Sequence, residues 1–200
     1  MKKILIIIAI VFCIEFAQAD SKPFNGKIHQ IPGKIEAEHY DVGAPGKAYY
    51  DFDAKNLGAN YREVTQVDIE KRSDASNGHG IGWTRKGEWL NYSVDVKETG
   101  TYVIEMQVAS NKVGGLFVFK VNDKSLCKPI HIPDTGGWDK LKLIKTAGVK
   151  LIKGRQVIRV VMLDQGESGS IGDIDYFNFK KYSSSSETSS ASTAKNRAKN

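Results

Sequence analysis

The chain contains very little cysteine. Its 200 residues include two, Cys13 and Cys127, and Cys13 lies in an N-terminal segment that we expect to be removed. The mature protein would then hold a single thiol, which excludes an intramolecular disulfide. A fold without that cross-link depends on its hydrophobic core or on a bound metal.

Long hydrophobic runs are also missing. The apolar run from 4 to 13 is too short to span the ~30 Å hydrocarbon core of a bilayer. It follows Lys2 and Lys3 and precedes Ala17-Gln18-Ala19, a small-x-small cleavage pattern. This arrangement predicts a signal peptide over residues 1–19, and therefore a secreted protein, extracellular or periplasmic. A retained membrane anchor is the alternative interpretation.

Charge of one sign is not concentrated anywhere. Lys and Arg number 29 against 23 Asp and Glu, a formal net charge of +6, and no basic block is interleaved with aromatic residues. This argues against a nucleic-acid partner. The sequence also lacks G-x-S-x-G, H-E-x-x-H, C-x-x-C and a phosphate-binding glycine loop, and its four histidines have no ligand-like spacing. We therefore expect no catalytic activity.

Helical periodicity is absent, and apolar residues instead alternate with polar ones. The segment 89–96 places Leu90, Tyr92 and Val94 on one face, and 102–108, 117–121 and 156–162 behave similarly. Glycine-containing turns separate these segments. The pattern predicts an all-β protein, an antiparallel β-sandwich of about eight to ten strands in a single domain. The domain would span 31–182, after a lead-in over 20–30.

Residues 183–200 form a Ser-rich tail with no apolar side chain larger than Ala. Such a segment cannot bury enough surface to offset its ordering entropy, so we expect a disordered linker. A plain ragged terminus is the alternative.

Two acidic pairs could carry chemistry, and three of their carboxylates are candidate metal ligands. If 35–38 is a strand, Glu36 and Glu38 point the same way, and a cation such as Ca²⁺ would relieve their repulsion. A solvated acidic edge explains the same pair. Asp173 and Asp175 precede an aromatic strand near the other end of the domain. Since chain ends are often adjacent in a sandwich, Asp175 could meet the two glutamates.

Two tryptophans lie in glycine-rich surroundings, Trp83 after Gly80-Ile81-Gly82 and Trp138 after Gly136-Gly137. Rings presented from such turns can stack on the apolar faces of sugars while hydroxyl groups take hydrogen bonds at the rim. Burial of both rings in the core is the competing interpretation.

A series of motifs in one order carries a family resemblance. The motifs are I-E-A-E-H-Y (35–40), A-N-Y-R (59–62), V-D-I-E (67–70), G-W-T-R-K-G-E-W-L-N-Y-S-V (82–94), G-T-Y-V-I-E-M-Q-V-A-S (100–110), T-G-G-W (135–138) and D-I-D-Y-F (173–177). Together they closely resemble family 6 carbohydrate-binding modules, over about 31 to 182.

The resemblance implies a jelly-roll sandwich with one structural Ca²⁺. Its ligands would be the side chains of Glu36, Glu38 and Asp175 and the backbone carbonyl near Arg62. Strict strand parity would point Asp173 and Asp175 the same way, so separate roles for them require a bend or bulge.

The resemblance also implies a sugar cleft. Trp83 and Trp138 would form its aromatic walls. Asp173 stands where the family often has Asn, and His79 stands where many relatives carry an aromatic residue that lines the cleft. Some members use a second site on a concave sheet face.

The implied partners are a polysaccharide of the xylan, β-glucan or agarose class and an associated glycoside hydrolase, with the chain itself a monomer. Two other hypotheses remain open. The chain could be a relative or fragment of a secreted hydrolase named for a catalytic domain found elsewhere, or an adhesion-type sandwich that binds protein.

Overall fold

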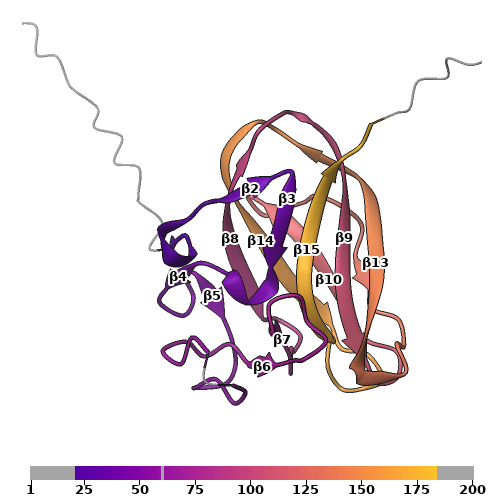
Figure 1. Ribbon diagram of the computed structural model, residues 1–200. Coiled ribbons are helices and arrows are strands. Elements are labelled where there is room, and N and C mark those ends of the chain that lie inside the picture. The colour runs from indigo at the N-terminus through magenta and orange to yellow at the C-terminus, as the bar shows by residue number, and fades with distance from the viewer. Residues whose placement is uncertain (1–20, 60, 184–200) are drawn as a thin grey trace, which may run out of the picture.

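The chain forms two β-sheets packed face to face (Figure 1). A computed structural model describes residues 21–59 and 61–183. In these ranges helical structure is limited to two 3-10 turns, η1 (Phe24–Gly26) and η2 (Ala37–His39), and no helix is long and apolar enough to cross a membrane. The predicted signal peptide and nearly all of the Ser-rich tail lie outside the described residues.

The first sheet has seven strands. Its main path runs β11-β10-β14-β8-β2, with β12 paired to β10 and β5 paired to β8. The strands are β2 (His29–Ile31), β5 (Tyr49–Tyr50), β8 (Trp89–Val96), β10 (Leu116–Val121), β11 (Lys124–Ser125), β12 (Ile130–His131) and β14 (Gly154–Asp164).

The second sheet has six strands, in the order β13-β9-β15-β7-β6, with β3 paired to β15. They are β3 (Gly33–Glu36), β6 (Ile69–Lys71), β7 (His79–Ile81), β9 (Gly100–Ser110), β13 (Gly137–Leu151) and β15 (Asp173–Lys181). A separate pair joins β1 (Ser21–Lys22) to β4 (Val42–Gly43).

The prediction of an all-β sandwich is confirmed, and the strand over 89–96 has the predicted bounds. The number of strands was wrong, because the described residues contain fifteen, of which nine are only two to four residues long. These short strands pair locally, and pairing over two or three residues leaves no alternation that a sequence can reveal. One pairing, β2 with β8, is parallel.

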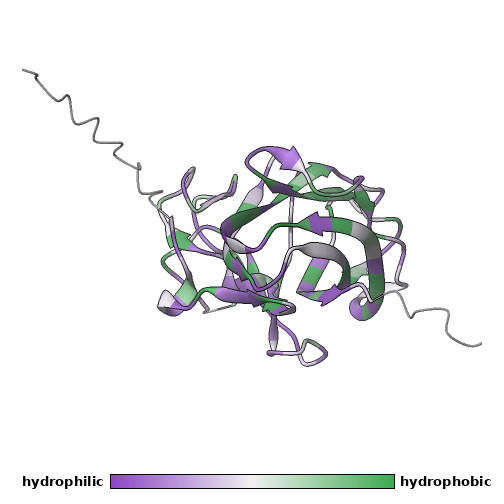
Figure 2. Cartoon of the chain, turned by 90° about the horizontal axis from the view of Figure 1, so that it is seen from above, coloured by the Kyte–Doolittle hydropathy of each residue, from purple (hydrophilic) through white to green (hydrophobic). Residues whose placement is uncertain are grey.

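Aromatic rings from the two sheets meet in the core. Phe119 of β10 contacts Phe177 of β15 edge to face, with ring centroids 5.1 Å apart, and Tyr92 of β8 meets the same ring at 5.7 Å. Such pairs add about 0.5–1.5 kcal/mol each beyond the area they bury. The alternation that directs these residues inward is visible as green and purple bands along the strands in Figure 2.

Strand β15 brings the two ends of the domain together. It pairs with β3, which places Glu36 opposite Tyr176, next to Asp175. Its register with β9 shifts between Ile174 and Tyr176, so β15 carries a bulge at Asp175. Because of this bulge, the side chains of Asp173 and Asp175 can lie in different surroundings although they are only two positions apart.

Candidate functional site

A pocket of about 390 Å³ opens at the end of the sandwich where β15 begins. Its lining comprises Glu70, Trp83, Arg85, Trp138, Ser168, Gly169, Ser170 and Asp173. The structure therefore brings Trp83, Trp138 and Asp173 together, three of the four residues that the sequence suggested for a sugar cleft.

Trp83 is presented to the pocket by an unusual backbone. Its φ is 48°, a left-handed value that bulky residues rarely adopt, and its side chain is 50% exposed. The adjoining residues are fastened to the loop before β15, because the Thr84 hydroxyl donates to the Gly172 carbonyl at 2.8 Å. The exposure argues against the core interpretation of Trp83.

Trp138 lies at the start of β13 and is partly buried. It follows Gly136, whose φ of 87° suits glycine, in a turn that Thr135 fastens to the end of β9. Arg72 donates a 2.6 Å hydrogen bond to the Trp138 carbonyl. The backbone that carries this ring is thus held from two sides.

The floor of the pocket is acidic and is organised by Arg72. Its guanidinium, only 4% exposed, lies 2.6 Å from Glu70 Oε1 and 2.9 Å from Asp173 Oδ2, and it also pairs with Asp74. Burial raises the pKa of Asp173, the nearby charge of Glu70 raises it further, and Arg72 opposes both effects.

Gly82 allows these carboxylates to sit close to the backbone. A Cβ at this position would lie 3.1 Å from Asp173 Oδ1 and 3.4 Å from Glu70 Oε1. The absence of a side chain therefore leaves room for both carboxylates, which Arg72 holds at 2.6 and 2.9 Å.

Two further polar side chains complete the lining. Ser168 has a buried hydroxyl oxygen with no hydrogen-bond partner. Arg85 is partly exposed and is held by Asp53, whose Oδ2 lies 2.6 Å from its guanidinium. The pocket thus combines two tryptophan side chains with hydrogen-bond donors and acceptors.

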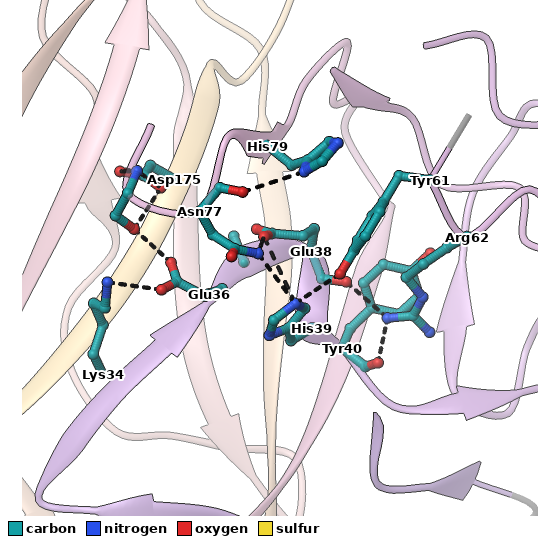
Figure 3. A network of polar contacts seen from close by, with 12 residues as sticks. Lys34, Glu36, Glu38, His39, Tyr40, Tyr61, Arg62, Asn77, His79 and Asp175 are labelled. Atoms are coloured by element: carbon teal, nitrogen blue, oxygen red, sulfur yellow. Dashed lines mark hydrogen bonds and ion pairs between the residues drawn. The ribbon is translucent and has the colours of Figure 1, made fainter. Parts of the chain in front are cut away.

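His79 does not line this pocket. Its ring stacks on Tyr61 with centroids 4.3 Å apart, and its Nδ1 lies 3.3 Å from the Asn77 carbonyl. Figure 3 shows it beside the carboxylate network, and it is not among the residues that line the tryptophan pocket. Position in a motif suggested the cleft, but the β7 strand directs this side chain elsewhere.

Glu36, Glu38 and Asp175 form that second cluster (Figure 3). Ser76 links two of them, since its hydroxyl lies 2.6 Å from Glu36 Oε2 and 3.1 Å from Asp175 Oδ1. The amide of Asn77 donates to Glu38 Oε1 at 2.8 Å. The three predicted carboxylates are therefore neighbours, joined through two consecutive residues of one loop.

The strand expected through Glu38 ends instead at Glu36, and Glu38 lies in the η2 turn. This turn buries Glu38 completely and leaves its Oε2 without a hydrogen-bond partner. Burial raises the pKa of Glu38 to about 7, and the charges of Glu36 and Asp175 add to the shift. An unpartnered carboxylate oxygen between like charges fits a cation ligand.

Within 21–59 and 61–183, however, no three His, Cys, Asp or Glu side chains already converge as a metal site would require. Ser76 and Asn77 take up oxygen atoms that an ion would need. Arg62 is also engaged, because its carbonyl accepts two hydrogen bonds from Thr65, at 2.9 and 2.8 Å. Its guanidinium lies 3.5 Å above the Tyr40 ring.

A second, smaller hollow of about 220 Å³ lies on the seven-stranded sheet, lined by Asn91, Lys120, Asn122, Asp123, Val157 and Arg159. The Arg159 guanidinium also stacks over Trp89 at 3.9 Å.

The sequence profile of carbohydrate binding module (family 6) matches residues 58–181. The chain belongs to this family. The family consists of non-catalytic binding modules, and its matched region contains every residue that lines the tryptophan pocket.

Solved members of the family share the fold of this module. A β-1,3-glucan binding member from Bacillus halodurans superimposes with a TM-score of 0.58 at 21% identity, covering 77% of this chain and 99% of that one. A module of Cellvibrio mixtus lichenase 5A, solved in complex with cellotriose, superimposes with a TM-score of 0.55 at 22% identity, covering 76% of this chain and 98% of that one.

A curated relative is the clotting factor G alpha subunit of Tachypleus tridentatus, 32% identical over 83 residues. The match takes in 40% of this chain but only 12% of that protein. The module therefore corresponds to a small part of that longer relative.

Sequence reasoning missed Glu70, Arg72, Arg85 and Ser168 as parts of the pocket. Glu70 is the last residue of the V-D-I-E motif, and this motif was the one signal in the sequence that could have pointed to it. Arg72 carried none, because Asp173, its partner, lies 101 positions away along the chain.

Proposed function

We propose that this module binds a polysaccharide of the β-glucan, xylan or agarose class through the pocket between Trp83 and Trp138. One pyranose ring would lie between the indoles, with its C–H groups on their faces. Its hydroxyls would donate to Asp173 and Glu70. The observation that supports this is the meeting of two tryptophans and two carboxylates in one open pocket.

The chemistry of the floor suits the hydroxyl groups of a sugar. The carboxyl oxygens of Asp173 and Glu70 accept hydrogen bonds, and Arg85 can donate them. Solved relatives include a β-1,3-glucan binding module and modules in complex with cellotriose or xylose, so both the β-glucan and the xylan classes belong to the proposal.

Affinity electrophoresis against laminarin, lichenan, xylan and agarose tests the proposal. We expect at least one polymer to retard the wild type and Trp83→Ala to lose retardation, since one aromatic anchor can contribute ~2 kcal/mol or more. Tyr182→Ala is the matched control, because Tyr182 is 59% exposed at the opposite end of β15. Equal retardation of Trp83→Ala and wild type would place binding elsewhere.

We propose no hydrolysis by this chain, and a role in holding an associated glycoside hydrolase against its substrate. A tethered module raises the local concentration of enzyme at the polymer. Secretion follows from the predicted signal peptide and is part of the same proposal. Release of reducing sugar by the purified chain, abolished by substitution of a single carboxylate, would contradict it.

We further propose that Glu36, Glu38 and Asp175 hold a structural Ca²⁺. The unpartnered, buried Oε2 of Glu38 is the supporting observation. The ion would add positive charge to a cluster whose Glu36 already pairs with Lys34 at 2.7 Å, and Ser76 and Asn77 would have to yield their hydrogen bonds to it. We leave Arg62 out of this ligand set because Thr65 occupies its carbonyl.

A further inference from the structure

The segment 49–53 presents two aromatic rings to solvent. Tyr49 and Asp51 are buried, whereas Tyr50 is 37% and Phe52 is 53% exposed. The alternation places Tyr50 and Phe52 on one outward face. Their rings form an edge-to-face pair with centroids 5.2 Å apart and planes at 74°. A fixed, exposed aromatic pair marks a binding surface more often than a single exposed ring does.

This pair adjoins the tryptophan pocket through Arg85. Arg85 lines the pocket, and its guanidinium lies 2.6 Å from Oδ2 of Asp53, the residue after Phe52. On the other side, the Phe52 ring packs against Gly87, where a Cβ would come within 3.5 Å of the ring. The aromatic pair and the pocket therefore share one loop, residues 85–87, as a common border.

The pair is held in place before any ligand arrives. Tyr50 pairs with Trp89 in the ladder between β5 and β8. The Asp51 carboxylate accepts a 2.7 Å hydrogen bond from the Asp53 backbone. Because these contacts already order the segment, a ligand that stacks on the rings does not pay for fixing them.

We infer that Tyr50 and Phe52 form an additional subsite for the sugar residues of a glycan chain that leaves the tryptophan pocket past Arg85. The inference rests on the proposed function. A pocket of about 390 Å³ is near the small end of ligand sites and accommodates only a short piece of a polymer. The next residues of the chain must run over the rim, and at Arg85 the rim leads to aromatic rings.

The subsite predicts that affinity grows with chain length. The probes are cello- and laminari-oligosaccharides of two to six residues, measured by isothermal titration calorimetry. We expect Phe52→Ala to bind the disaccharide as the wild type does and to bind the hexasaccharide about tenfold more weakly, equivalent to about 1.4 kcal/mol. Trp83→Ala should lose both ligands.

Tyr50→Ala provides a second variant with the same expected pattern, and Tyr182→Ala again serves as the control. Melting temperatures within a few degrees of the wild type establish that the variants fold. Should either variant fail to fold, Phe52→Ser is tested in its place.

The outcomes separate this inference from the proposed function. If the wild type binds the hexasaccharide no better than the disaccharide, or if Phe52→Ala keeps the full gain with length, the subsite is refuted and the pocket stands. If the wild type binds none of the probes or polysaccharides, the proposed function fails and the subsite with it. A wild-type dimer that Phe52→Ala dissociates, with unchanged glycan affinity, would assign the rings to self-association and refute the subsite.

Discussion

Replacement of Arg72 by Gln should destabilise the module strongly, because Arg72 neutralises a buried carboxylate. The Arg72 and Asp173 side chains are 4% and 7% exposed. Removing one partner of a buried ion pair leaves an uncompensated charge, at a cost of about 3–5 kcal/mol. The other two carboxylates, of Glu70 and Asp74, are 22% and 33% exposed and regain water more easily. We therefore expect Arg72→Gln to lower the free energy of unfolding by about 3 kcal/mol.

For a domain of this size, about 3 kcal/mol corresponds to a fall in melting temperature of roughly 6–12 °C. The assay is thermal and urea unfolding of the wild type and Arg72→Gln. Lys86→Gln is the matched control, since Lys86 and its partner Asp164 are 64% and 61% exposed. A surface pair of this kind contributes about 0–1 kcal/mol.

Asp173→Asn should rescue part of the loss, because it removes the charge that Arg72→Gln leaves behind. Asn is also the residue that the family often carries here, so the second substitution suits the fold. We expect the double-mutant cycle to give a coupling energy of about 1–3 kcal/mol. Strictly additive effects, or an Arg72→Gln variant that melts with the wild type, would refute the role of Arg72 as the counter-charge of Asp173.

Three other predictions concern stability and the pocket. Burial raises the pKa of Glu88 from 4.5 to about 7, so the stability that the protonated carboxyl gives is full below pH 4.5 and is lost as the pH rises to about 7. The melting temperature should fall over that range, and Glu88→Gln should make it depend less on pH. An unchanged pH dependence in Glu88→Gln would contradict this. Chelation of Ca²⁺ should lower the melting temperature by several degrees, since an ion that binds only the folded state, at a concentration of 100 times its Kd, adds about 2.7 kcal/mol of stability. Glu38→Gln should abolish this difference. Identical melting curves with calcium and with chelator, in protein shown to be metal-free, would exclude the site. Gly82→Ala should weaken polysaccharide retardation with little loss of stability, because its Cβ would crowd the two floor carboxylates; undiminished retardation would show that they do not bind the sugar.

The predictable part of this protein was its periodic part. Alternation over eight or more residues, as in 89–96, reports a strand with one buried face, because the side-chain period of a strand is two. Glycine turns and the order of motifs were sufficient for the sandwich and for the family. They also pointed to Trp83, Trp138 and Asp173, since residues in loop motifs keep their order along the chain even when their geometry is unknown.

Only the tertiary structure decided which side chains share a pocket. Arg72 and Asp173 lie far apart in the sequence, and the pairing of β7 with β15 brings their neighbourhoods together. The bulge at Asp175 and the three-residue turn that buries Glu38 are local departures from regular strand geometry, which no periodic pattern reports. His79 and Arg62 illustrate the converse, because their positions in motifs were informative but the directions of their polar groups were set by contacts with Tyr61 and Thr65.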